Sequence, residues 1–188
     1  MDKAELAGAP RELLTPRVRL ESGRLAHAPA LMAAINASLP DLRYIAWGQH
    51  PVDLAWAESF SQRGARYIDD GDCLIYSAFL RDGGELVGRI DLHSFDLETP
   101  RAEIGYVADS RQAGRGLMRE AVLAVVELAF SLGFLRIEAI SDARNARALR
   151  FAASLGFTQE AVLRSHARDP QGGLCDEVLF ALLHPSVR

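Results

Sequence analysis

Alternation of apolar and polar residues predicts a strand near the start of the chain and a run of strands in its middle. The segment TPRVRLES alternates at period two and places Val18 and Leu20 on one side. Further on, the runs CLIYSAFL and ELVGRIDLHSF flank the turn Asp82-Gly83-Gly84, a combination typical of a β-hairpin. A third run, RAEIGYV, comes next, so we expect three consecutive antiparallel strands.

Two helices are expected between the first strand and this meander. The earlier one covers about residues 25–39, where Pro40 stops it, and the later one begins at Pro51 and ends near residue 66. Residues 1–13, ahead of the first strand, are expected to form a loose lead-in.

The connector between these helices, DLRYIAWGQHP, is aromatic and irregular. Tyr44 and Trp47 in it, and Trp56 in the following helix, are costly to expose unless they face a ligand or a partner. Two interpretations remain open. The aromatic residues cover a ligand cleft, with Tyr44 and Trp47 as substrate contacts, or they only pack the helices onto the sheet, which we favour for Trp56.

The second half of the chain alternates helices and strands. A long apolar helix is predicted over residues 116–132, and the near-continuous apolar run FLRIEAIS after it is typical of a buried strand parallel to its predecessor. A further helix is expected over residues 144–155, with Ser141 or Asp142 as its N-cap. Two strands joined by a turn complete the pattern, and the whole predicts an α+β fold.

Composition and charge narrow the class of protein. With 49% hydrophobic and 24% charged residues, the 188-residue chain can bury a core without disulfides or metals. The formal net charge of -4 disfavours a nucleic-acid partner, which normally requires a basic surface. Cys73 and Cys175 lack the spacing of zinc ligands, and we interpret them as small buried residues on strands. No segment has the pattern of a membrane span or a secretory signal, so we expect a cytoplasmic protein.

The stretch of residues 101–132 is the strongest pointer to a function. A strand runs there through a loop containing Gly114 and Gly116 directly into the long helix. Backbone N–H groups at such a junction point outward at one spot, and the helix dipole adds positive potential, so we expect a phosphate-bearing cofactor. The loop lacks the third glycine of GxGxxG and a following Gly-Lys-Ser/Thr, which excludes a dinucleotide fingerprint and a Walker loop.

Several motifs at fixed mutual spacing resemble the GCN5-related N-acetyltransferase (GNAT) superfamily, and within it the RimJ/RimL-like branch. They are AEIGYVAD leading into GRGLMREAV, the strand FLRIEAIS, the helix DARNARALRFAASLGF and the tail LRSHARD…LCDEVLFALL. The likeness covers about residues 15–183, the core of a single domain over residues 1–188. It implies an α+β GNAT fold with a mixed, splayed sheet of about seven strands, helices on both faces, and acetyl-CoA in the split of the sheet.

The resemblance also assigns cofactor-binding roles. It implies that backbone groups of Val107 and Ala108 hold the pantetheine arm, and that Asn145 matches a family asparagine with the same ligand. The pyrophosphate would be held by N–H groups of the loop and the first helical turn, with added charge from Arg115: Gly114, Arg115, Gly116, Leu117 and Met118. No metal site is implied.

The loop signature of the superfamily, Gln/Arg-x-x-Gly-x-Gly/Ala, can be placed here in two ways. One placement runs through Arg111, Gly114 and Gly116, and the other runs through Ala113, Gly116 and Met118. Both placements use the same amides, so they imply the same cofactor site.

Two positions depart from the family pattern. Ala152 stands where many members have a tyrosine, and Ala148 stands where RimL-like relatives often have a serine. These are the common donors of a proton to the leaving thiolate, so another residue or water performs this step, or the protein does not catalyse acetyl transfer. Tyr106 is expected to point to the face opposite Glu103 and to pack under the long helix.

Glu103 is the candidate catalytic base. Many family members place a base glutamate on this strand, and a protonated amine must lose a proton before it attacks a thioester. The alternative is a glutamate that faces solvent or pairs with an arginine such as Arg101. His93, His166 and Asp176 are further candidates for contact with the substrate, and Asp176 matches an acidic position common in RimJ/RimL-like tails.

The resemblance implies an acetyl-CoA-dependent N-acetyltransferase that works by direct attack in a ternary complex, since neither cysteine has a context that would activate it. A protein N-terminal α-amine is the favoured acceptor, and a polyamine, an amino acid or an antibiotic is the alternative. A closed pocket lined by Tyr44 and Trp47 would favour the small acceptor. A third alternative is a non-catalytic acyl-CoA-binding module, and a homodimer is expected by analogy with family members.

Overall fold

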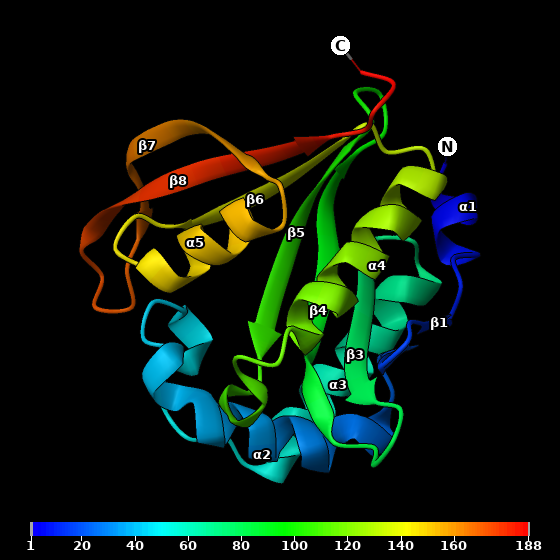
Figure 1. Ribbon diagram of the computed structural model, residues 1–188. Coiled ribbons are helices and arrows are strands. Elements are labelled where there is room, and N and C mark those ends of the chain that lie inside the picture. Colours follow the sequence, from blue (N-terminus) through cyan, green and yellow to red (C-terminus); the bar gives the residue numbers. More distant parts are fainter. Residues whose placement is uncertain (1, 188) are drawn as a thin grey trace.

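The computed structural model describes residues 2–187, which form one mixed sheet of eight strands (Figure 1). The strand order is β1-β2-β3-β4-β5-β6-β8-β7, and every neighbouring pair is antiparallel except β5 and β6. The strands are β1 Glu12–Leu14, β2 Val18–Ser22, β3 Leu74–Leu80, β4 Leu86–Asp96, β5 Arg101–Ala108, β6 Arg136–Asp142, β7 Thr158–Arg168 and β8 Leu174–Leu183. The three consecutive antiparallel strands expected from the sequence are β3, β4 and β5.

The N-terminal segment is ordered, so the expected loose lead-in is wrong. Helix α1 (Lys3–Ala7) begins with a capping box in which Asp2 accepts a hydrogen bond from the Glu5 amide at 2.9 Å. Leu6 is fully buried, and the Tyr76 hydroxyl donates to the Pro10 carbonyl at 2.7 Å. These tertiary contacts hold a segment that is too short to show helical periodicity, and they place β1 beside β2.

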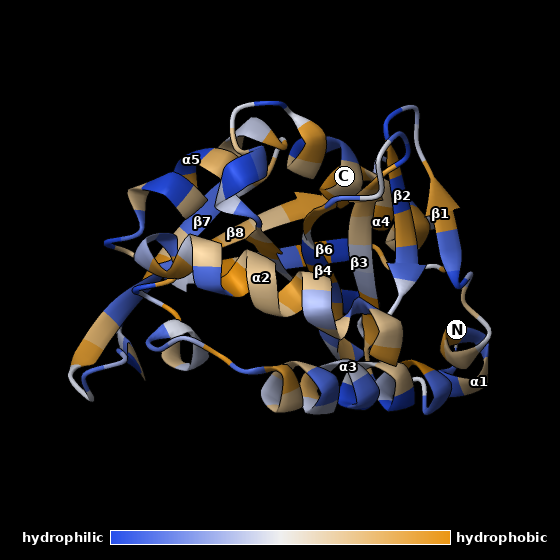
Figure 2. Ribbon diagram, turned by 90° about the horizontal axis from the view of Figure 1, so that it is seen from below, coloured by the Kyte–Doolittle hydropathy of each residue, from blue (hydrophilic) through white to orange (hydrophobic). Residues whose placement is uncertain are grey.

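Helices cover both faces of the sheet, as Figure 2 shows. On one face lie α2 (Ala28–Ser38) and α3 (Leu54–Asp69), and on the other lie α4 (Leu117–Ser131) and α5 (Ala146–Ser154). Short 3₁₀ turns are found at Leu25–His27, Leu39–Asp41, Ala46–Gly48 and Ser110–Gln112. No helix within residues 2–187 has the length and apolar character needed to cross a membrane.

Alternation along β4 and β5 divides their residues between the two faces. Ile90, Leu92 and Ile104 are buried in the larger core, which also contains the apolar stripe of α4. The alternate positions of β4 bear polar residues, and on the face of α2 and α3 they pair with residues of β5: Arg89 with Val107, Asp91 with Gly105, and His93 with Glu103.

The sheet splits between β5 and β6, the only parallel pair of strands within residues 2–187. The pairing of β5 with β6 consists of Arg101 with Arg136, Ala102 with Ile137, and Glu103 with Glu138. Beyond Glu103 no residue of β5 in the described chain pairs with β6, and the two strands diverge (Figure 1). The free edge of β5 from Gly105 onward therefore faces an opening in the sheet.

Candidate active site

Two adjoining cavities lie at this split. The split cavity, of about 420 Å³, passes between β5 and β6 and is bounded by the residue 44–47 connector and α5. The loop cavity, of about 400 Å³, lies between the end of β5, the loop of residues 112–116 and α5. The two cavities share Tyr106, Val107 and Ala108 on β5 and Asn145 and Ala148 near the start of α5. A ligand in one cavity can therefore meet a ligand in the other along β5.

The loop cavity contains most of the predicted cofactor residues. Gly114 and Gly116 have positive φ angles of 76° and 72°, which only glycine adopts readily, and Gly116 is the N-cap of α4. Seven of the eight predicted residues line this cavity: Val107, Ala108, Gly114, Gly116, Leu117, Met118 and Asn145. Backbone N–H groups at the start of α4 are thus presented to a cavity, as an anion site requires.

Arg115 is the exception among the predicted cofactor residues. Its side chain is exposed, donates to Gln112 and does not line the loop cavity, while Arg119 and Arg147 do line it. Arg111 is also turned away from the cavity, because it forms a bidentate pair with the buried carboxylate of Asp109, with its Nη2 at 2.6 Å from Oδ2. Arg111 therefore anchors the loop to the end of β5.

Close packing around Gly88 brings β4, β5 and the start of α4 together. A Cβ atom at this position would lie 2.5 Å from the carbonyl oxygen of Val107 and 2.8 Å from the sulfur of Met118. Any larger residue would displace the strand edge that the two cavities share. Gly88 therefore helps to set the position of Val107.

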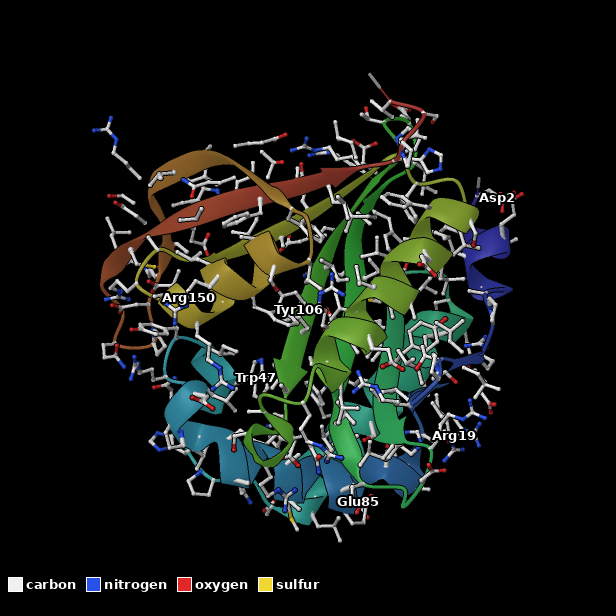
Figure 3. The ribbon with its side chains drawn as sticks, viewed as in Figure 1. Asp2, Arg19, Trp47, Glu85, Tyr106 and Arg150 are labelled. Carbon is white, nitrogen blue, oxygen red and sulfur yellow. The ribbon has the colours of Figure 1, made fainter. Side chains whose placement is uncertain are left out.

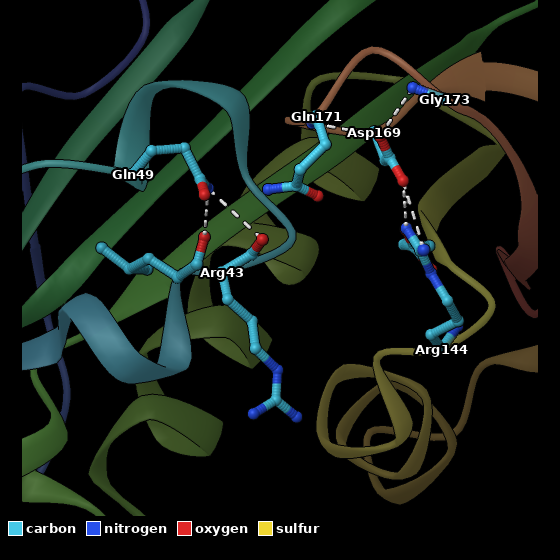
Figure 4. Close-up of polar contacts among 8 residues, drawn as sticks. Arg43, Gln49, Arg144, Asp169, Gln171 and Gly173 are labelled. Carbon is cyan, nitrogen blue, oxygen red and sulfur yellow. Dashed lines mark hydrogen bonds and ion pairs between the residues drawn. The ribbon is translucent and has the colours of Figure 1, made fainter.

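The N-cap of α5 is Asn145, so the prediction of Ser141 or Asp142 is wrong. The Asn145 side chain accepts a hydrogen bond from the Ala148 amide at 3.2 Å. Asp142 instead receives the guanidinium and the amide of Arg144, and this pairing lowers the pKa of the Asp142 carboxyl. Arg144 also reaches Asp169 in the β7–β8 turn, as Figure 4 shows, and this contact ties that turn to the start of α5.

Glu103 lies at the closed end of the split, where pairing of β5 with β6 stops. Its carboxylate is 3.9 Å from His93 Nε2, and the His93 Nδ1 atom is 3.0 Å from the Glu103 carbonyl oxygen. Burial raises the pKa of Glu103, His93 opposes this effect, and the carboxylates of Glu138, Glu177 and Asp91 add to it. Arg101 pairs with Asp96 and Glu138, and the described residues show no Arg101–Glu103 ion pair.

Four acidic residues line the split cavity: Asp91, Asp109, Asp142 and Glu177. Asp109 and Asp142 pair with Arg111 and Arg144, while Asp91 and Glu177 are further carboxylates that the sequence patterns do not indicate. Asp91 projects from β4, with one oxygen 3.8 Å from His93 Nδ1, and Glu177 projects from β8. Glu103 itself does not line the cavity. The His93 ring therefore lies between the carboxylates of Glu103 and Asp91, next to the cavity wall.

The aromatic residues of the connector and of α3 divide between the cavity wall and the packing of the helices. Tyr44 and Trp47 line the split cavity, while Trp56 lines neither cavity and stacks on Phe60 at 4.7 Å. Trp47 also contacts this pair, with its ring 5.8 Å from that of Phe60. The Gln49 amide fixes the connector by donating to the carbonyl of Ile45 at 2.6 Å and that of Arg43 at 3.3 Å (Figure 4).

His166 and Asp176 lie outside the linings of both cavities. The His166 Nδ1 atom is 2.7 Å from a carboxylate oxygen of Glu177, and thus touches a residue of the split cavity. Asp176 accepts a hydrogen bond from the Ser165 amide at 2.8 Å, where Ser165 has a positive φ angle of 50°. Asp176 therefore stabilises the bulge in β7.

Tyr106 points to the face opposite Glu103, as expected, but it packs beside α5 rather than under α4. Its ring meets that of Phe151 edge-on at 5.1 Å, and Figure 3 shows Tyr106 between β5 and α5. Tyr106 lines both cavities, and Ala148 and Ala152 line the split cavity with it. Burial raises the pKa of Tyr106 to about 12, so the phenol remains protonated at neutral pH.

This sheet, with its split beside a glycine loop, defines the class of protein. Residues 17–158 match the model of the acetyltransferase (GNAT) domain, and the chain belongs to this family. The curated relatives include the uncharacterized N-acetyltransferase p20 of Bacillus licheniformis, 32% identical over 115 residues, and the probable N-acetyltransferase YjcK of Bacillus subtilis strain 168, 33% identical over 114 residues. These matches cover 61% and 58% of the chain, and the chain spans 64% and 61% of the two relatives.

Solved structures of acetyltransferases share the fold. The microcin C7 self-immunity acetyltransferase MccE, in complex with acetyl-CoA and AMP, superposes with a TM-score of 0.83 at 20% identity, over 90% of this chain and 94% of MccE. RimL, the ribosomal L7/L12 α-N-protein acetyltransferase in complex with coenzyme A, gives 0.81 at 19% identity, over 91% and 96%. The likeness confirms the predicted GNAT fold.

Proposed function

We propose that the protein is an acetyl-CoA-dependent N-acetyltransferase that transfers the acetyl group to a primary amine by direct attack. The observation that carries this proposal is the junction of the two cavities at Tyr106, Val107 and Ala108, just beyond the last paired residues of β5 and β6. A thioester extended along the free edge of β5 from the loop cavity would meet an amine that enters the split cavity. Holding two reactants in this way supplies much of the rate enhancement in such reactions.

The loop cavity suits the phosphate-bearing part of acetyl-CoA. The left-handed glycines at 114 and 116 open the loop in front of α4, whose dipole favours an anion, and Arg119 and Arg147 add full positive charges. The free edge of β5 at Val107 and Ala108 can bond to the amides of the pantetheine arm as a neighbouring strand would. A backbone N–H of this edge is also the proposed donor to the thioester carbonyl.

Direct attack on the thioester is supported by the state of the two cysteines. Burial raises the pKa of the Cys73 thiol to about 12 and also raises the pKa of the Cys175 thiol. Neither residue supplies a thiolate at neutral pH, so neither is a suitable covalent carrier.

Two proton transfers are assigned to residues on opposite faces of β5. Glu103 is the proposed base, acting on the amine through an intervening water, because its carboxylate lies at the end of the split behind His93. Tyr106 is the proposed donor to the leaving thiolate, because it shares the split cavity with Ala148 and Ala152, which replace the usual donors. The raised pKa of Tyr106 keeps its proton available over the working pH range.

The proposed acceptor is a protein N-terminal α-amine. The structural likeness to RimL, the ribosomal L7/L12 α-N-protein acetyltransferase, supports this acceptor. The carboxylates of Asp91 and Glu177 support it as well, because they attract an ammonium group. A small amine is the second candidate, because Tyr44 and Trp47 line the split cavity. A cytoplasmic location and a homodimer stay predictions.

Release of free CoA thiol distinguishes the two acceptor classes. Peptides that begin with Ala or Ser would be compared with the same peptides blocked at the amino terminus, and with polyamines and aminoglycosides. We expect turnover with the free peptides and none with the blocked ones. Turnover confined to the small amines would contradict the N-terminal assignment and support the second candidate.

A further inference from the structure

Arg89 places a positive charge in the wall of the split cavity. It lies on β4, opposite Val107, and lines the cavity close to the junction with the loop cavity. Its guanidinium carbon is 4.1 Å from the centre of the Phe60 ring, a cation–π contact that orients the side chain. Arg63 of α3 approaches the same ring at 5.7 Å and adds further positive potential at this end of the cavity.

No carboxylate of the described chain neutralises this charge directly. Within residues 2–187, no acidic oxygen lies within 4.0 Å of the Arg89 guanidinium nitrogens, and its side chain makes no hydrogen bond. Asp91 is the nearest acidic neighbour along the strand, but its carboxylate turns toward β5 and His93. A Cβ atom on Gly105 would lie only 3.0 Å from Asp91 Oδ2.

A partly buried guanidinium without an ionic partner is costly, because the folded chain has removed part of the water that would otherwise solvate it. Burial lowers the pKa of Arg89, and the Asp91 carboxylate offsets only part of this effect. A ligand that carries a negative charge would offset this cost by pairing with the guanidinium. The Arg fork suits a carboxylate or a phosphate, to which it can donate two hydrogen bonds.

The opposite end of the same cavity is acidic. Asp91 and Glu177 line it, and Glu103 lies behind His93 at the closed end of the split. Asp109 and Asp142 also line the cavity, but their charges are paired with Arg111 and Arg144. Successive residues on one face of a strand are about 7 Å apart, so Arg89 lies at least one such step from Asp91 and further from Glu103. The cavity is therefore polarised, with a site for a cation beside a site for an anion.

We propose that the acceptor carries an anionic group a few bonds from its amine, and that Arg89 selects the acceptor by pairing with this group. The inference rests on the proposed acetyl transfer and narrows its substrate class to acidic amines. The anion can belong to a free amino acid or to an acidic side chain near the start of a peptide. Asp91 and Glu177 attract the amine while Arg89 holds the anion.

Initial rates with two matched pairs of acceptors test this inference. The pairs are alanine against alaninamide, which lacks the carboxylate, and the peptide Ser-Glu-Ala-Ala against Ser-Gln-Ala-Ala. In at least one pair, kcat/KM for the acidic member should exceed that for the neutral member by on the order of tenfold. The pair that shows this preference identifies the source of the anion.

In Arg89→Met, the ratio of kcat/KM for the acidic member to that for the neutral member should fall to about one, because only the acidic acceptor is slowed. Arg89→Lys should retain part of the preference. The midpoint of thermal unfolding should stay unchanged or rise in Arg89→Met, because the variant removes a partly buried charge without an ionic partner. Arg63→Met, which alters an exposed guanidinium at the same ring, is the matched control and should leave most of the preference in place.

Equal kcat/KM values for both members of both pairs would overturn the inference and leave the proposed function intact. A preference that survives Arg89→Met, or that disappears only in Arg63→Met, would also overturn it. The absence of thiol release with all four acceptors and with the wider amine panel would instead contradict the proposed acetyl transfer itself.

Discussion

Glu103 of β5 lies directly opposite Glu138 of β6, and this is the last residue pair that joins the two strands. Two carboxylates thus mark the point at which the sheet splits. Glu138 is held by Arg136 at 2.7 Å, whereas Glu103 has only the distant contact with His93. Of these two carboxylates, Glu103 is therefore the one without a close ionic partner in the described chain.

Replacing Glu103 with Gln should lower kcat by about 10²–10⁴-fold if Glu103 is the base. Because burial raises the pKa of Glu103, kcat/KM of the wild-type protein should fall as the pH drops through a value above the ordinary 4.5. This acidic limb should be absent in Glu103→Gln. A pH series of initial rates at saturating acetyl-CoA provides the measurement.

Glu177→Gln is the matched control for the base, since Glu177 lines the split cavity and is held by His166. It should retain the acidic limb. If Glu177→Gln loses the limb and Glu103→Gln keeps it, the base is Glu177 and our assignment is wrong.

The stability of Glu103→Gln separates a catalytic role from a structural one. A carboxyl with a raised pKa in the folded state favours folding more when protonated, so its contribution to stability falls as the pH rises through that pKa. The neutral amide avoids this loss. Glu103→Gln should therefore be at least as stable as the wild type to urea at pH 7, and marked destabilisation would indicate a structural role.

Tyr106→Phe should lower kcat by about 10–100-fold with little change in the KM for acetyl-CoA, because only the proposed proton donor is removed. With a pKa of about 12, Tyr106 should produce no loss of activity up to about pH 10. Tyr67→Phe, at an exposed position of α3, is the control and should behave as the wild type. Full activity of Tyr106→Phe would leave water as the donor.

Gly114→Ala should weaken the binding of acetyl-CoA as measured by calorimetry. A positive φ costs an L-residue about 1–2 kcal/mol, so the loop would shift away from the position that presents its amides. Gly172→Ala is a matched control, because Gly172 also has a positive φ and open space around it but lies in the β7–β8 turn. Equal affinities in the two variants would contradict a role of this loop in holding the cofactor.

Sequence patterns predict β5, its alternation between two faces and the glycine loop before α4, because residues 102–118 carry local constraints such as the positive φ of Gly114. The binding of a cofactor by this loop stays a prediction. Arg89 and Asp91 are harder to predict. With His93 they form the polar half of an alternating strand, which is also the pattern of a solvent-exposed face. Only the split between β5 and β6, a tertiary feature, turns part of that face into the wall of a cavity.

The N-terminal segment is a second feature that depends on tertiary contacts and is therefore hard to predict from sequence. Helix α1 has five residues, too few for helical periodicity, and it is held by the burial of Leu6 and by packing of the segment near Pro10 against Tyr76. The N-cap of α5 is a local feature, yet Asn145 replaces the expected Ser141 or Asp142. Asp142 was available as a cap by residue type, but its carboxylate is bound to Arg144.

We claim that the split between β5 and β6 brings acetyl-CoA and an amine together for transfer. The most direct measurement is the amount of free CoA thiol released from acetyl-CoA by the purified protein, with mass spectrometry of the acceptor in the same reaction. We predict one acetylated amine for each thiol released, and no release without an acceptor. Binding of acetyl-CoA in calorimetry without thiol release for any amine in a broad panel would contradict the claim and identify a non-catalytic acyl-CoA-binding module.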